Sequence, residues 1–481
     1  MAEVRSFDWR LFRALALIFF AAKLVLLVAV QPFMDETYYW LWGQHPDLSY
    51  FDHPPMVGWT AGLASVFGWN IVALRLPVLL TLLGDLWLLH ALARHLRGEA
   101  WREAFWPTAA LFLATPIIFG LTALAMPDHL LIFFALLAVY AIERFRTGYE
   151  AGVPRWRFLY LAAFAIGCAT LSKYTGALLA LGVVAIFVFT PRLRSVWRSP
   201  HVYLAALLAI AMQAPVIAWN LQHDLASFGF IVGGRRPLPD LRNLTGLTGY
   251  LAGIPFVFSP FLLWALIRFL GARGDGHGYA RWVFWASTLG FLAASFFTNI
   301  LIHWNILAYV VVLPFLFQWL RSRWLVVGHF VYGALLALVM AANFAVTSVQ
   351  GMISFVDQTT AWSYGWEKLA PEIRGIAVAE GATFVATTDY ALAGPLAFAL
   401  GDRDVTSLSP RTEAFDYWFD AEAHRGQDAI ILADRWRGLG EGITSQFASV
   451  ELVKRLDVQQ FGKHVNRYEV YIARAYSPPS Q

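Results

Sequence analysis

The stretch MDETYYWLWGQHPDLSYFDHPPMVGW, residues 34–59, separates two apolar runs and is the long polar interruption in the first ninety residues. It carries four carboxylates and two histidines among many tyrosines and tryptophans, and it contains no lysine or arginine. A bare connection between two apolar helices does not need acids and aromatic rings at this density. We therefore expect the rest of the chain to be a scaffold that holds this segment, within a first loop of residues 31–69, at the outer face of a bilayer.

The composition is that of a membrane protein. The chain has 481 residues, of which 58% are hydrophobic and 14% are charged, whereas soluble domains carry about 25% charged residues. A mean hydropathy of +0.55 indicates a polytopic protein. The net charge of +4 is therefore no sign of a nucleic-acid partner. The single cysteine, Cys168, excludes a disulfide within the chain and a cysteine-based metal site.

Eleven apolar stretches have the composition of membrane spans, which need about 20 apolar residues each. They are residues 11–30, 70–93, 104–121, 129–142, 158–171, 176–190, 201–219, 247–268, 282–298, 305–320 and 324–345.

Basic residues orient these spans. With the N-terminus inside, the inner segments hold eighteen arginines, and the outer segments before the C-terminal part hold only Lys173, Arg235, Arg236 and Arg242. Lysine and arginine gather on the cytoplasmic side of membrane proteins. Lys23 lies inside the first span, where it either reaches the interface or faces the helix bundle.

From about residue 346 charges of both signs return, and the pattern becomes that of a small α/β domain. ATFVATT and DAIILAD predict buried strands, WSYGWEKLAPEIRGIAVAE and the stretch after Asp389 predict helices, and the C-terminal residues alternate like a hairpin. The predicted fold is a polytopic α-helical membrane protein of about eleven transmembrane helices, residues 1–345. A periplasmic α/β domain, residues 346–481, follows it.

Two acids, Asp35 and Glu36, directly follow the first span. The next residues, TYYWLW, suit an amphipathic helix lying in the membrane interface. Asp35 would then stand at the N-terminus of that helix. It is either a helix cap or a general base that deprotonates an acceptor hydroxyl, and the pattern leaves both open.

A second polar cluster is FDHPP, where the prolines keep Asp52 and His53 out of a helix. This pair forms either a hydrogen-bonded turn or part of a site for a divalent metal (Mg, Mn or Zn), with His223 or Asp224 as a distant partner.

The remaining outward polar residues lie at helix ends and in loops. Lys173, Arg235 and Arg236 suit a phosphate, with interfacial anchoring as the alternative. The rest of this set is Met126, Pro127 and Asp128, Ser172 and Tyr174 beside Lys173, and His303, Trp304 and Asn305. Charges at membrane depth are expensive and mark functional sites.

Six motifs resemble those of a known family. They are DETYYWLW, YFDHPPMVGW, MPDHLLIFF, LSKYTGALL, WNLQHDLASF and HWNILAY, in family order over about residues 10–320. The chain resembles the bacterial GT-C glycosyltransferases of the protein-O-mannosyltransferase-like superfamily, which include the lipid A aminoarabinose and galacturonose transferases.

The resemblance implies inverting transfer of a sugar from a polyprenyl-phosphate donor at the outer face of the inner membrane. By position, Asp35 matches the catalytic carboxylate of the first loop, with Glu36 as its rival, and Asp128 matches a second acid of the active centre. Residues matching the donor site are His53, Lys173 and Tyr174, with Arg235 and Arg236 as further cations. Asp52 and His223 match a metal pair. The aminoarabinose enzymes have Glu-Lys at Asp52-His53, so the metal and the sugar stay open.

Three functions compete. The first is transfer to lipid A, core oligosaccharide or another envelope glycan, and the second is protein O-mannosylation. The third is transport or flipping of a lipid or sugar. Transporters show internal repeats and polar residues at the bilayer midplane, and this sequence shows neither clearly. The partners expected are therefore a polyprenyl-phosphate-sugar, a lipid or glycan acceptor and membrane lipids.

Overall fold

The computed structural model describes residues 8–233, 244–272, 277–298, 300–353 and 355–479. The chain separates into two compact units. The bundle unit comprises Met1–Val25, His53–Met56 and Val78–Ala337, and the α/β unit comprises Leu26–Asp52, Val57–Pro77 and Leu338–Gln481. Most of the first loop thus belongs to the unit that contains the C-terminal part of the chain.

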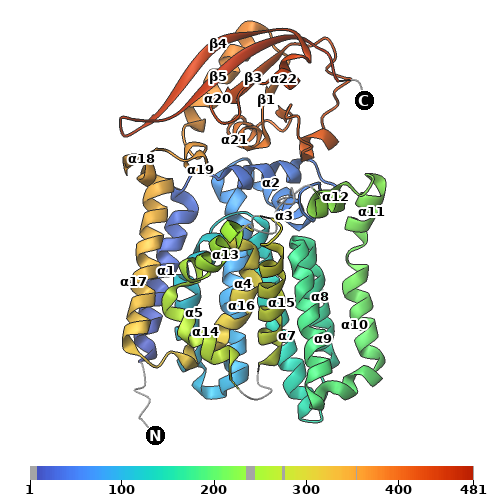
Figure 1. The fold of residues 1–481 in the computed structure, drawn as a ribbon, viewed down its shortest axis with the longest axis vertical. Helices are drawn as coiled ribbons and strands as arrows, with labels where there is room; N and C mark the ends of the chain where they lie inside the picture. Colours follow the sequence, from blue (N-terminus) through green and yellow to red (C-terminus); the bar gives the residue numbers. More distant parts are fainter. Residues whose placement is uncertain (1–7, 234–243, 273–276, 299, 354, 480–481) are drawn as a thin grey trace. The chain divides into compact units, whose positions relative to one another are not determined.

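The bundle unit is helical (Figure 1). Its helices, of which α1, α4 and α17 continue into the α/β unit, are α1 Trp9–Ala29, α4 Ile71–Arg97, α5 Trp101–Ala114, α6 Pro116–Leu121, α7 Pro127–Glu150, α8 Trp156–Ser172, α9 Leu178–Phe189, α10 Pro200–Ala211, α11 Ala214–Gln222, α12 Ala226–Gly233, α13 Leu244–Phe258, α14 Leu263–Leu270, α15 Gly278–Ala294, α16 Ile306–Val312 and α17 Arg323–Ala341. Short helical turns join them: η2 Gly98–Ala100, η3 Tyr174–Ala177, η4 Pro191–Arg198, η5 Pro260–Leu262, η6 Ile302–Asn305, η7 Leu313–Phe315 and η8 Phe317–Trp319.

Each of the eleven apolar stretches is largely helical, and the chain is that of a membrane protein. Among the described residues, three runs are long and apolar enough to cross a bilayer, and up to six if each of three bent pairs counts as one span. One bend, of 85°, separates Gly246–Phe258 from Pro260–Leu270. Ser259 has φ 90° there and precedes a proline, which cannot continue the hydrogen bonding of the helix. The number of eleven spans therefore stays a prediction.

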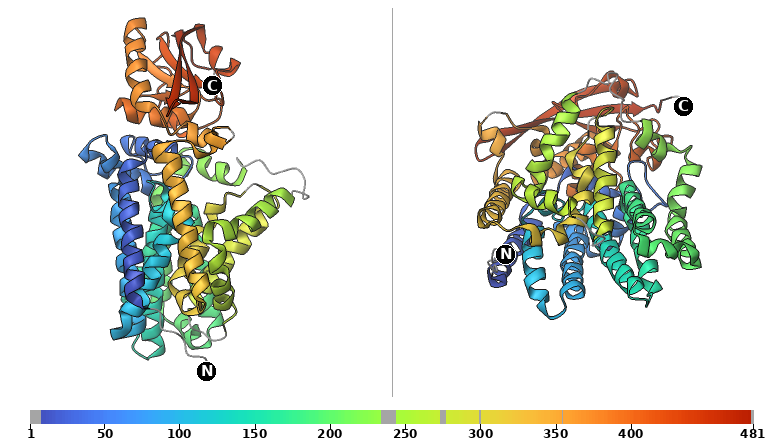
Figure 2. Two further views of the ribbon diagram at one scale, coloured as in Figure 1. Left: turned by 90° about the vertical axis from the view of Figure 1, so that its left-hand side faces the viewer. Right: turned by 60° about the horizontal axis from the view of Figure 1, so that its bottom comes forward.

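Aromatic packing joins the first and last long helices of the bundle unit. Phe330 of α17 lies 6.0 Å from Phe12 and 6.3 Å from Phe19 of α1, measured between ring centroids. The two helices run side by side in Figure 1 and in the left view of Figure 2. Segments that are more than 300 residues apart in the chain thus share one apolar contact.

The α/β unit contains a five-stranded sheet of order β2-β1-β3-β5-β4. The strands are β1 Phe384–Thr387, β2 Thr406–Ser407, β3 Ala429–Asp434, β4 Phe447–Gln460 and β5 Lys463–Tyr476. β1 pairs parallel with β2 and β3, and β5 pairs antiparallel with β3 and β4. The predicted strands and the terminal hairpin are confirmed.

Helices cover one face of this sheet. α20 Trp366–Glu380 packs on β3, α21 Tyr390–Leu400 packs on β1 and β2, and the two helices contact each other. The other elements of the unit are α2 Met34–Gln44, α3 Met56–Ala64, η1 Ser65–Phe67, η9 Ala342–Val346, α18 Val349–Ile353, α19 Gln358–Ala361, η10 Ala414–Tyr417 and α22 Glu441–Thr444.

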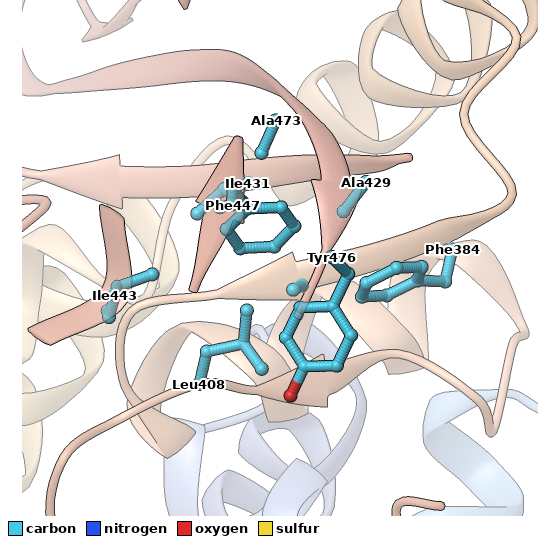
Figure 3. Packing of buried hydrophobic residues seen from close by; sticks show 9 residues of the cluster. Phe384, Leu408, Ala429, Ile431, Ile443, Phe447, Ala473 and Tyr476 are labelled. Carbon is cyan, nitrogen blue, oxygen red and sulfur yellow. The ribbon is translucent and has the colours of Figure 1, made fainter. Parts of the chain in front are cut away.

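An apolar core fills the opposite face (Figure 3). Phe384 pairs with Ala429 and Ala386 pairs with Ile431 across β1 and β3, so all four side chains point the same way. The rest of this core is Leu408, Ile443, Phe447, Ala473 and Tyr476. β1 and β3 are thus largely buried on both faces, as their continuously apolar sequences predict, whereas most of β4 is exposed.

Helix α2 differs from the amphipathic interfacial helix expected at TYYWLW. All residues from Glu36 to Trp42 are buried. The reason is packing on two sides within the α/β unit. A Cβ at Gly394 of α21 would come within 2.9 Å of the backbone nitrogen of Tyr38, and one at Gly43 within 2.3 Å of the backbone nitrogen of Gly62 on α3.

Candidate active site

The predicted site residues fall in both units. Asp35, Glu36 and Asp52 belong to the α/β unit, whereas His53, Asp128, Lys173, Tyr174 and His223 belong to the bundle unit. The chain passes from one unit to the other at the peptide bond between Asp52 and His53.

Glu36 forms a buried ion pair with Arg75 at the start of α4. Arg75 donates from Nε to Glu36 Oε1 at 2.8 Å and from Nη2 to Oε2 at 2.7 Å, and the two side chains are 2% and 0% exposed. Glu36 Oε2 also accepts the backbone N–H of Phe33 at 2.8 Å, which satisfies a donor just before the first residue of α2. This arrangement favours a structural role for Glu36.

Arg75 also fixes the end of α1. Its Nη1 donates to the backbone carbonyls of Leu27 at 3.0 Å and Val30 at 2.8 Å. These carbonyls belong to the last turn of a helix, where they lack partners within the helix. One guanidinium thereby joins the end of the first span to the first turn of α2, and so sets the position of Asp35. Arg75 was not predicted as a site residue, because in the sequence it is a lone cation near the start of an apolar run.

Asp35 is half-buried on α2. Tyr390, the first residue of α21, is near enough to respond to its charge. Burial raises the pKa of the Tyr390 phenol, and the negative charge of Asp35 raises it further. Asp35 is thus placed on a buried helix, beside a phenol that stays protonated.

Asp52 is held by a tyrosine of α2. Tyr38 Oη donates to Asp52 Oδ2 at 2.5 Å, and Tyr38 itself is 3% exposed. Burial raises the pKa of Asp52, while the hydrogen bond from Tyr38 and the charge of Arg411 oppose that rise. Neither Tyr38 nor Arg411 was singled out from the sequence. Tyr38 resembled one of several interfacial aromatics, and Arg411 is distant in the chain.

In the bundle unit, Asp128 and Lys173 form a buried pair. Lys173 Nζ donates to Asp128 Oδ1 at 2.8 Å, with side chains 7% and 1% exposed. Asp128 lies in the first turn of α7, and Lys173 follows the last residue of α8. His53 and His303 also interact electrostatically with Asp128. Four chain segments therefore bring three basic groups and one acid together, and all four residues were singled out from the sequence.

Other predicted residues are engaged elsewhere in the bundle unit. The Tyr174 hydroxyl lies 2.8 Å from Ser227 Oγ. Asn305 bonds Ser287 and Thr288 of α15, which indicates a structural role in its turn. Lys23 faces the bundle and donates to the carbonyl of Phe119 at 2.5 Å. Arg235 and Arg236 lie outside the described residues.

The metal expectation finds little support in the side chains. Within the part of the chain that the structure describes, no group of three or more His, Cys, Asp or Glu residues is arranged to hold a metal ion. His223 Nδ1 is 2.8 Å from the carbonyl of Trp219 and its ring stacks on that indole, while Asp52 is bonded to Tyr38. The described residues do not fit a metal site, so no chemical step is assigned to a metal.

Comparison with known proteins adds to this geometry. The model of the dolichyl-phosphate-mannose-protein mannosyltransferase family matches residues 52–219. Lipid A galacturonosyltransferase RgtD of Rhizobium johnstonii is 26% identical over 300 residues, and the alignment covers 58% of this chain and 58% of that relative. The chain thus matches a little over half the length of this curated relative.

Solved structures show the same fold. ArnT from Cupriavidus metallidurans in the apo state matches with a TM-score of 0.60 and 16% identity, over 98% of both chains. The structure of that protein bound to undecaprenyl phosphate matches with a TM-score of 0.59. The motifs, the family match over residues 52–219 and the fold agree: the chain is similar to GT-C glycosyltransferases that modify lipid A.

Proposed function

We propose that this protein transfers a sugar, with inversion, from a polyprenyl-phosphate carrier to a hydroxyl group of lipid A, core oligosaccharide or another envelope glycan. Transfer takes place at the periplasmic face of the inner membrane. The observation that carries the proposal is the buried Asp128–Lys173 pair with His53 and His303 around it. The name of RgtD, a lipid A galacturonosyltransferase, and the undecaprenyl phosphate bound to ArnT support it.

The basic residues of the bundle unit suit the donor phosphate. As the bond between the sugar and the phosphate breaks, negative charge grows on the leaving polyprenyl phosphate, and preorganised cations in a buried site stabilise such charge strongly. Lys173 supplies a cation held in place by Asp128, and His53 and His303 supply further donors when protonated.

The acids of the α/β unit suit the acceptor. The acceptor oxygen attacks the anomeric carbon, the carbon–oxygen bond to phosphate breaks, and the polyprenyl phosphate leaves with the bonding electrons. Asp35 takes the proton of the acceptor hydroxyl as general base. A single displacement of this kind inverts the anomeric carbon. Glu36 is bound to Arg75 and Phe33, so Asp35 is the better base.

The second candidate function is transfer to a protein hydroxyl. It is favoured by the family whose model matches residues 52–219, because that family is described as acting on proteins. Mass spectrometry of envelope lipids and envelope proteins from a deletion strain separates the two. Loss of a sugar from lipid supports the first function, and loss of a sugar from protein only would replace it.

The donor site is tested by exchanging both members of the buried pair. Lys173→Ala alone would leave a buried carboxylate uncompensated, which costs about 3–5 kcal/mol and would confuse loss of fold with loss of function. Asp128→Asn with Lys173→Met removes both charges together. We expect the folded double variant to lose binding of undecaprenyl phosphate and sugar transfer.

The matched control is an exposed pair of the same type. Lys454 and Glu372 are 2.7 Å apart with side chains 48% and 52% exposed. Glu372→Gln with Lys454→Met should keep binding and turnover. Unchanged binding of undecaprenyl phosphate by the Asp128/Lys173 double variant would show that this pair does not bind the donor phosphate.

A further inference from the structure

Within the α/β unit, a short segment of the C-terminal part contacts the first loop through stacked rings. This segment, residues 413–418, includes η10, and is called the 413–418 segment below. Its three stacked pairs, with centroid distances, are Phe415–Tyr38 at 5.8 Å, Tyr417–Phe51 at 5.8 Å and Trp418–His45 at 4.6 Å. Their interplanar angles are 28°, 27° and 4°. Three first-loop side chains therefore share one stretch of six residues as their partner.

A hydrogen-bond chain runs from this segment to Asp52. The backbone N–H of Ala414 donates to Tyr38 Oη at 3.1 Å, and Tyr38 Oη donates to Asp52 Oδ2 at 2.5 Å. Because the single hydroxyl proton of Tyr38 is directed to Asp52, its lone pair is free to accept from Ala414. Both bonds are thus compatible. The backbone N–H of Ala414 holds the Tyr38 hydroxyl, and this hydroxyl is the donor to Asp52.

The other end of Tyr38 is fixed by backbone packing. Gly394 of α21 faces the Tyr38 backbone so closely that a Cβ there would come 2.9 Å from its nitrogen. The ring of Tyr38 also lies 4.9 Å from that of Tyr390. The phenol is consequently held at its backbone, at its ring and at its hydroxyl.

Arg411 adds a charge next to the same segment. Its guanidinium lies over the Tyr390 ring at 5.1 Å, and its Nε is 3.7 Å from Glu413 Oε1. The charge of Arg411 also acts on Asp52. Arg411, two residues before the 413–418 segment, therefore helps to balance the negative charge of Asp52.

We propose that Tyr38 is a positioning residue for Asp52 and that the 413–418 segment, through the N–H of Ala414, holds Tyr38 in that role. The C-terminal part is then a component of the catalytic apparatus rather than an appended tail. The proposal rests on the proposed function and adds to it that Asp52 takes part in sugar transfer.

The test uses the full-length protein and Tyr38→Phe, which removes one hydroxyl and keeps the ring. With the polyprenyl-phosphate-sugar that supports turnover of the unchanged protein, we expect kcat to fall by roughly 10–100-fold, as for other residues that orient a functional side chain. In a protein that already carries Asp52→Asn, Tyr38→Phe should lower kcat no further, because Tyr38 acts through Asp52. If Tyr38 were merely structural, Tyr38→Phe would lower kcat by the same factor with and without Asp52→Asn, and that result would overturn the proposal.

Hydrogen exchange provides a readout that needs no substrate. In Tyr38→Phe the amide of Ala414 loses its acceptor, so peptides covering the 413–418 segment should exchange faster than in the unchanged protein. The control is Tyr468→Phe, the same chemical change at a buried tyrosine of β5 whose ring lies 5.3 Å from that of Trp366. In this variant kcat and exchange of the 413–418 segment should stay unchanged.

The outcomes separate the two claims. Unchanged exchange in Tyr38→Phe would show that the hydrogen-bond chain is absent and would overturn the proposal. If the unchanged protein transfers no sugar from any polyprenyl-phosphate donor, the proposed function fails and the positioning role fails with it. Faster exchange would in that case still show the Ala414–Tyr38 bond.

Discussion

Replacing Glu36 by Gln should destabilise the protein strongly while sparing its chemistry. Glu36 accepts two bonds from Arg75 and one from Phe33 in a site where both charged side chains are at most 2% exposed. The variant leaves the Arg75 cation buried without its counter-ion, and breaking a buried pair in this way costs about 3–5 kcal/mol. Arg75 keeps its bonds to the backbone carbonyls at the end of α1. We therefore expect the loss in free energy of unfolding to lie at the lower end of this range.

The assay is denaturant unfolding of purified protein, together with turnover per folded molecule. Glu367→Gln is the matched control, since Glu367 makes one exposed hydrogen bond, from Gln31 at 3.0 Å, in the same unit; such surface changes stay within about 0.5 kcal/mol. Normal stability of Glu36→Gln with abolished turnover would refute the structural reading and transfer the role of base to Glu36.

Three further results are expected. Asp35→Asn should lower turnover by about 10²–10⁴-fold with undecaprenyl phosphate binding retained in direct binding measurements, and near-normal turnover would leave Asp35 only a structural role in the first turn of α2. An alkaline phosphatase fusion after Gln350 should be active and one after Arg198 inactive, because arginines gather inside; the reverse activities would invert the topology. The pKa of Glu413 is raised from an ordinary 4.5 to about 8 by burial and by the charges of Asp389 and Asp52, against the opposing charge of Arg411. The folded protein therefore binds a proton that the unfolded chain loses, and unfolding should become easier as the pH rises from 4.5 to 8. Glu413→Gln should remove that loss in thermal melts at pH 5 and pH 8, and an unchanged pH dependence would assign it to another group.

Local pattern was enough for much of the fold. Apolar runs of span length and the uneven placement of arginine indicate a membrane protein, because a bilayer imposes the same length and charge rule on every helix. The strands at ATFVATT and DAIILAD were predictable for a related reason, since buried strands of parallel character are continuously apolar. The bend at Ser259 could not be predicted from the sequence, because the proline that follows it interrupts a helix without setting the angle between the two halves.

The candidate site divides in the same way. Sequence by itself singled out Asp35, Asp128, Lys173 and the FDHPP turn, because charged residues at or near membrane depth are uncommon and mark functional sites. Only the tertiary structure decided which of them are paired. It placed Lys173 against Asp128, Glu36 against Arg75 and Tyr38 between Ala414 and Asp52. These partners are separated by 14 to 376 residues in the chain, and hydrogen-bond geometry at such separations is set by packing, which no local pattern of residues encodes.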